Sequence, residues 1–166
     1  MEESRSAACS IITVIAGRVN AVTPDEQINE CLEKVLLTAF GLIKERGWHI
    51  PMGFTLAQSG EFSYVLSDKS TADDDDPYDY DEASDAVRDR VQKMVGEQNM
   101  VIAGVATNEL TRFSDSADKQ TTVKITICHR AAPGVTIFYP YRVVKGRVEQ
   151  DQPLEMDADE DFFAGK

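Results

Sequence analysis

The sequence has few of the side chains that bind soft metals or form disulfide frameworks. Three cysteines and two histidines occur in 166 residues, and neither a C-x-x-C nor an H-x-x-x-H pair is present. Zinc sites need such ligands at short spacing, and small secreted scaffolds have paired cysteines. We therefore expect no metal, no cofactor and a reducing, cytoplasmic location.

Signatures of nucleotide binding and nucleophilic catalysis are also missing. The chain has no G-x-S-x-G, no P-loop and no G-x-G-x-x-G sequence. Its apolar segment Ala7–Ala16 is too short to cross a bilayer, and Glu2 and Glu3 before it disfavour a signal peptide. No catalytic residue and no membrane contact are predicted, although an active site that leaves no local motif stays an alternative.

Positive charge is scarce, because 17 lysines and arginines stand against 29 acids and the net charge is −12. Residues 68–85 hold nine acids and one lysine, and residues 149–166 hold seven acids and one lysine. These segments carry −8 and −6, so the rest of the chain sums to +2. Such a field disfavours direct nucleic-acid binding and favours a basic protein partner.

Hydrophobic periodicity predicts two amphipathic helices. The first begins at a capping box, Thr23 to Glu26 with Pro24 at its first position, and ends at Gly47. The second follows the acidic loop 67–82 and ends near Gly96. Residues 7–22 fit a helix or a strand, and the spacing slightly favours a helix.

Alternating apolar residues predict the strands. A hairpin covers Gly53–Leu66, and further strands are expected in 100–110, 121–130 and 135–144. The order α-β-β-α-β-β-β predicts an α+β fold, an antiparallel sheet of about five strands with the helices on one face. We expect one domain over 1–148 and an acidic, flexible tail over 149–166.

Two short motifs are similar to motifs of known proteins. "PMGFTLAQSGEF" (Pro51–Phe62) enters the hairpin, and "CHRAAPGVTIFYPY" (Cys128–Tyr141) closes the last strand. With these motifs, the chain between Thr23 and Val144 resembles a set of small bacterial α+β proteins that have a Pro-x-Gly-x hairpin entry and a last strand ending in Pro-Tyr. The resemblance implies the α+β class and no settled activity.

The acidic stretch "STADDDDPYDYDEASD" (Ser70–Asp85) is the most unusual feature. A calcium loop started at Asp73 would put Tyr78 where glycine is needed and Ser84 where the bidentate glutamate belongs, so spacing disfavours an EF-hand. Aromatic residues among acids suit binding of a basic partner instead, and the tail repeats this composition. The predicted partner-binding residues are Asp73, Asp74, Asp75, Asp76, Tyr78, Asp79, Tyr80, Phe162 and Phe163. A solvated acidic loop is the competing interpretation.

Other candidate residues have structural interpretations. Cys128 and His129 are adjacent in a predicted strand, so their side chains point to opposite faces. His129 is therefore expected to be a hydrogen-bonded core histidine. Glu61 and Glu109 are the acids outside the two acidic segments that could line a pocket on the sheet. The tail could also fold back onto the basic residues of 142–147.

These features predict a small acidic cytoplasmic interaction module, such as an immunity or inhibitor-type protein that binds a basic partner. One alternative is an inhibitor that mimics nucleic acid. Another is an enzyme or ligand-binding domain with a pocket on the sheet. The apolar segment "TIFYPY" (Thr136–Tyr141) also suggests a homodimer through a sheet edge.

Overall fold

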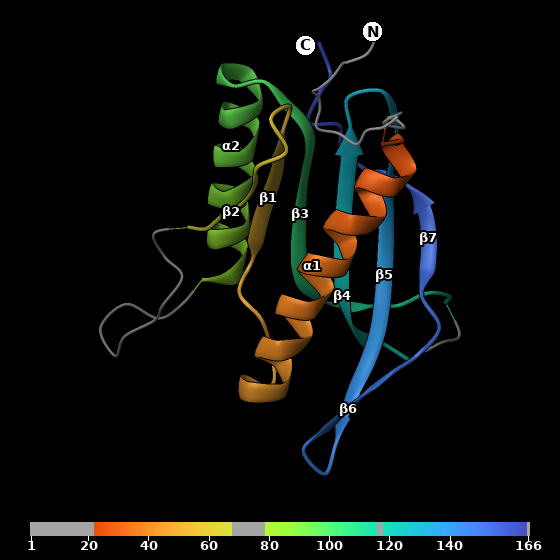
Figure 1. The fold of residues 1–166 in the computed structure, drawn as a ribbon. Coiled ribbons are helices and arrows are strands. Elements are labelled where there is room, and N and C mark those ends of the chain that lie inside the picture. The colour runs from red at the N-terminus through yellow and green to blue at the C-terminus, as the bar shows by residue number, and fades with distance from the viewer. Residues whose placement is uncertain (1–21, 68–78, 116–117, 166) are drawn as a thin grey trace, which may run out of the picture.

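The computed structural model describes residues 22–67, 79–115 and 118–165. These residues fold into an α+β structure with two helices and seven strands (Figure 1). Their bounds are α1 Pro24–Arg46, β1 Met52–Ala57, β2 Phe62–Val65, α2 Tyr80–Glu97, β3 Met100–Thr111, β4 Gln120–His129, β5 Ala132–Val144, β6 Arg147–Gln150 and β7 Leu154–Asp157. The α+β class is confirmed, but two strands follow the predicted five. Of residues 7–22, for which a helix is slightly favoured, all but Val22 lie outside the described residues.

The sheet is antiparallel throughout, in the order β2-β1-β3-β4-β5-β6, and β7 also pairs with β5. Strand β5 has 13 residues. Its inner edge pairs with β4, and its outer edge pairs with β7 over Val135–Phe138 and with β6 over Tyr141–Val144. The segment Thr136–Tyr141, considered as a free dimerisation edge, is therefore inside the sheet.

The two helices cover opposite faces of the sheet, so the prediction that they share one face is wrong. Adjacent residues of a strand point to opposite faces. In β1, Phe54 packs in the cluster that contains Val35 and Ala39 of α1, whereas a side chain at Gly53 would meet Val91 of α2. The sheet is thus a middle layer, and a second cluster that includes Val91 fills the other side.

Local sequence signals set the helix ends. The capping box of Thr23 and Glu26 is present, with the Glu26 amide 3.1 Å from Thr23 Oγ1. Helix α1 ends at Gly47, whose φ of 88° is left-handed and suits glycine. Helix α2 begins after Asp79, whose carboxylate accepts the amide of Glu82 at 3.0 Å. The predicted caps of α1 are confirmed.

The acidic C-terminal part, predicted as a flexible tail from 149, instead forms β6 and β7 and then crosses the sheet. We call residues 158–163 the C-terminal strap. It lies on the α2 face, where Phe162 is 2% exposed and packs in the cluster with Val95 and Cys128. The Gln92 amide donates to the Phe162 carbonyl at 2.9 Å. Burial of one large aromatic side chain thus fixes the end of the chain on the sheet.

Candidate partner-binding cleft beside helix α2

A cleft of about 630 Å³ opens between the first turns of α2 and the end of β3. Residues four apart on a helix share a face, so Asp81, Asp85 and Arg88 of α2 point to the same side. The end of β3, where the strand extends past the helix, supplies the opposite wall. The lining residues are Tyr80, Asp81, Ser84, Asp85, Arg88, Asn108, Glu109 and Leu110.

Acidic groups outnumber basic groups in this cleft. Asp81 and Asp85 are exposed, and Glu109 is half-buried. Neither aspartate forms an ion pair with a residue in the described part of the chain. Arg88 is the one lysine or arginine among the lining residues. The cleft therefore presents uncompensated negative charge.

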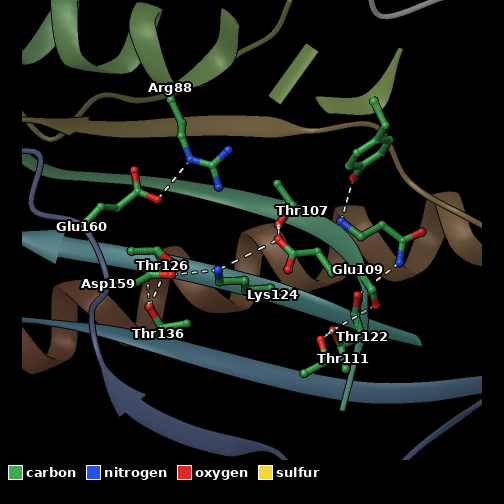
Figure 2. Close-up of polar contacts among 12 residues, drawn as sticks. Arg88, Thr107, Glu109, Thr111, Thr122, Lys124, Thr126, Thr136, Asp159 and Glu160 are labelled. Atoms are coloured by element: carbon green, nitrogen blue, oxygen red, sulfur yellow. Dashed lines mark hydrogen bonds and ion pairs between the residues drawn. The ribbon is translucent and has the colours of Figure 1, made fainter. Parts of the chain in front are cut away.

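The strap neutralises that arginine. Arg88 Nε donates to Glu160 Oε2 at 3.1 Å, and both side chains are about one-quarter exposed. Figure 2 shows this pair bridging α2 and the strap above the sheet. Because Arg88 is occupied by Glu160, its charge does little to offset the carboxylates of Asp81 and Asp85.

A second polar group lies on the same sheet face (Figure 2). Lys124 Nζ is 2.8 Å from Asp159 Oδ2 and 4.0 Å from Glu109 Oε2. Glu109 also accepts a hydrogen bond from Thr107 at 2.7 Å. These contacts hold Glu109 at the edge of the cleft and join the cleft to the strap.

Asp159 is bound on both carboxylate oxygens. Its Oδ1 lies 3.3 Å from the hydroxyls of both Thr126 and Thr136, which are themselves 2.9 Å apart. Partial burial raises the pKa of Asp159, but the hydrogen bond and charge of Lys124, together with hydrogen bonds from the backbone and Thr126, leave the pKa below its ordinary value. Asp159 is thus held as a carboxylate.

The predicted partner-binding residues have different positions. Asp73, Asp74, Asp75, Asp76 and Tyr78 lie outside the described residues. Asp79 is the N-cap of α2, and Phe162 and Phe163 belong to the strap.

Tyr80 has a structural position at the start of α2. Its hydroxyl donates to the His49 carbonyl at 3.1 Å and accepts the Asn108 amide at 2.6 Å. Its ring packs edge-on against Trp48. Asp79, Tyr80 and Phe162 therefore have folding roles that the sequence interpretation did not assign.

Asp81, Asp85 and Arg88, which line the cleft, were not predicted as candidate binding residues. The i, i+4, i+7 spacing on one helix face was the available signal, but the two aspartates also suit the helix dipole. Glu109, noted as an acid that could line a pocket, does line the cleft, whereas Glu61 is exposed beside the hairpin turn.

The histidines and cysteines of the described residues do not form a cluster. His129 is 7% exposed, and its Nε2 lies 2.7 Å from Gln27 Oε1. Cys128 points to the opposite face, as predicted, with Sγ 3.4 Å from the Glu160 carbonyl. Burial raises the pKa of Cys31 to about 11 and also raises that of Cys128. Within residues 22–67, 79–115 and 118–165, no cluster of three or more metal-binding side chains occurs.

Comparison with known proteins identifies no relative of this chain. No protein-family model, curated protein or solved structure matches the chain. Neither described helix is long and apolar enough to cross a membrane.

Proposed function

We propose that this protein is an acidic interaction module that binds a basic segment of a partner protein in the cleft beside α2. The observation that supports this proposal is the convergence of Asp81, Asp85 and Glu109 on one cleft. The one cation there, Arg88, is paired with Glu160. A lysine or arginine side chain in the cleft would meet several carboxylates at once.

Charge outside the cleft strengthens this electrostatic attraction. Asp73 to Asp76 lie a few residues before α2 in the sequence, and the net charge of the whole chain is −12. Negative charge gathered in one part of the chain speeds the encounter with a basic partner and makes the association rate depend on salt. An inhibitor or immunity-type protein that neutralises a basic enzyme is the form of this function that best fits such charge.

Removing the cleft charges while leaving the fold intact tests the proposal. The triple variant Asp81→Asn, Asp85→Asn and Glu109→Gln removes three charges with little change in side-chain size. A matched control, Glu30→Gln, Glu33→Gln and Glu45→Gln, removes the same charge from exposed positions of α1 on the opposite face of the sheet. Both variants and the parent are immobilised, and proteins retained from an extract of the source cells are identified at 50 mM and 500 mM salt.

The parent is expected to retain basic proteins at low salt and to release them at high salt. The cleft variant should lose most of them, and the α1 control should keep them. The affinity of the purified partner should fall at least tenfold for the cleft variant, since three charge contacts are lost. Equal losses for the two triple variants would reduce the effect to net charge and contradict a specific cleft.

A further inference from the structure

Strand β7 is an edge with an open side. Its four residues pair with β5 alone, and no other described strand lies beside it (Figure 1). All four residues are exposed. An exposed strand edge presents unpaired backbone amides and carbonyls, which can pair with another extended chain.

A groove of about 520 Å³ lies between β7 and α1. Apolar residues form much of it, including Ile28 and Leu32 of α1 and Ile137 of β5. Three acids, Asp25, Glu155 and Asp157, are also among the lining residues, and no lysine or arginine is. The groove therefore combines an apolar surface with negative charge.

The two faces of β7 differ in chemistry. Glu155 pairs with Ile137, which packs in the cluster with α1, so Glu155 and Asp157 share the α1 face. Leu154 and Met156 point to the other face and are 45% and 55% exposed. The strand thus presents two carboxylates on one side and two exposed apolar side chains on the other.

We infer that β7 is a docking edge for an extended segment of a partner protein in which basic and apolar residues alternate. Directly opposite residues of paired strands share a face. Basic residues of the incoming segment would therefore face Glu155 and Asp157, and the apolar residues between them would cover Leu154 and Met156. Opposite charges and apolar pairs across strands are both favourable. The basic character of this partner rests on the proposed function, but the surface is a different one.

The same charges disfavour pairing of β7 with a second copy. An antiparallel pairing of two β7 strands centred on Met156 would place Glu155 of each copy opposite Asp157 of the other. Like charges directly opposite each other destabilise a strand pair. A basic strand from another protein therefore fits this edge better than a second copy does.

Two hexapeptides of identical composition serve as probes for the full chain. One is fluorescein-labelled Lys-Val-Lys-Val-Lys-Val, and the other is its block isomer, Lys-Lys-Lys-Val-Val-Val. Affinity is measured by fluorescence anisotropy at 50 mM salt, and amide hydrogen exchange is followed at residues 154–157. The alternating peptide should bind about tenfold more tightly, because two cross-strand ion pairs and the apolar contacts form together in that isomer alone. It should also slow exchange in β7.

Backbone pairing is tested with two N-methylated versions of the alternating peptide, one methylated at the lysines and the other at the valines. The amides of alternate residues point to the same side of a strand. One methylated peptide should therefore lose binding and the other should keep it. Equal binding of both methylated peptides, or equal affinity for the two isomers, would overturn the inference.

Two double variants separate this surface from the cleft. Glu155→Gln with Asp157→Asn should abolish the preference for the alternating peptide, whereas Asp81→Asn with Asp85→Asn should retain it. The opposite result would place peptide binding in the cleft and overturn docking at β7. Loss of partner capture by the cleft variant alone, with β7 binding unchanged, would support both surfaces separately. If the cleft variant and the α1 control lose the partner equally, but the parent still prefers the alternating peptide, the proposed function is rejected and docking at β7 is retained.

Discussion

Lys124 of β4 and Asp159 of the strap form an ion pair, with Nζ and Oδ2 2.8 Å apart across 35 residues of sequence. The lysine side chain is 15% exposed and the aspartate is 52% exposed. The pair therefore sits at the boundary between the sheet and solvent. It joins the acidic end of the chain to the wall of the cleft through Glu109.

Asp159→Asn is expected to lower the free energy of unfolding at pH 7 by about 1 kcal/mol, because the pair is half-exposed. The pKa of Asp159 is lower in the folded state than its ordinary value of 3.8. The ionised carboxylate therefore makes its full contribution to stability at pH values above 3.8, the ordinary pKa. This contribution is lost as the pH falls through the lower pKa of the folded state. Urea unfolding at pH 7 and at pH 3 should show the difference from the parent shrinking in acid. Asp89→Asn is the control, because Asp89 is exposed and forms no ion pair with another described residue. An equal effect of both substitutions would contradict a specific role of the pair.

Phe162→Ala is expected to release the strap from the sheet. A buried phenylalanine replaced by alanine costs about 3 kcal/mol, and Phe162 is 2% exposed. Phe163→Ala is the matched control, because that ring is only partly buried against the same cluster and lies 5.1 Å from the Arg130 guanidinium. It should cost about 1 kcal/mol.

Labelling of cysteine thiols measures the release of the strap from the sheet directly. Cys128 lies under the strap, and Cys31 lies in the cluster on the opposite face of the sheet. The experiment uses a Cys9→Ser background, so that these two are the thiols that can be labelled. Phe162→Ala should speed labelling of Cys128 at least tenfold, since local opening exposes it, and leave Cys31 nearly unchanged. An equal acceleration at both cysteines would indicate global unfolding instead.

Elements marked by local signals were predictable from the sequence. Thr23, Glu26 and Gly47 define α1 because caps act through contacts a few residues apart. The alternation of Val123, Ile125 and Ile127 defined β4 for a similar reason, as one face of a strand recurs every second residue.

Features that depend on distant partners were not predictable. Strands β6 and β7 bury almost nothing, so they lack an apolar pattern and exist because β5 is long enough to pair with both. The sheet face that each helix covers was also not predicted, because an apolar stripe indicates that a helix packs against the core but not on which face of the sheet. The signal was in β3, where Met100–Ala106 contains no polar residue, as expected for a strand buried on both faces. The cleft lies between α2 and β3. It could therefore be predicted only if the packing of α2 against β3 was known.

Gly53 is expected to be required for the packing of α2 on β1. A methyl group there would lie 2.5 Å from Val91 and 2.9 Å from Val87. Gly53→Ala should therefore lower the free energy of unfolding by about 2 kcal/mol through overpacking. Gly41→Ala in α1 is the control, since no atom beyond the neighbouring helix backbone lies within 4 Å of the added carbon, and it should stabilise the helix by about 0.5–1 kcal/mol. Urea titration of both variants checks the opposite signs, and a neutral Gly53→Ala would contradict the close contact.

Tyr80→Phe separates a structural role of this tyrosine from a partner-binding role. The substitution removes the hydroxyl that joins the Asn108 amide to the His49 carbonyl and keeps the ring against Trp48. Loss of these two hydrogen bonds should lower the free energy of unfolding by about 1–2 kcal/mol. The hydroxyl of Tyr64 also has two partners, Thr38 and the Lys34 carbonyl, but at a more exposed site, so Tyr64→Phe should cost less. Partner affinity should stay within twofold of the parent for both variants, because the cleft charges are unchanged. Weaker partner binding by Tyr80→Phe with unchanged stability would instead make the hydroxyl part of the binding surface.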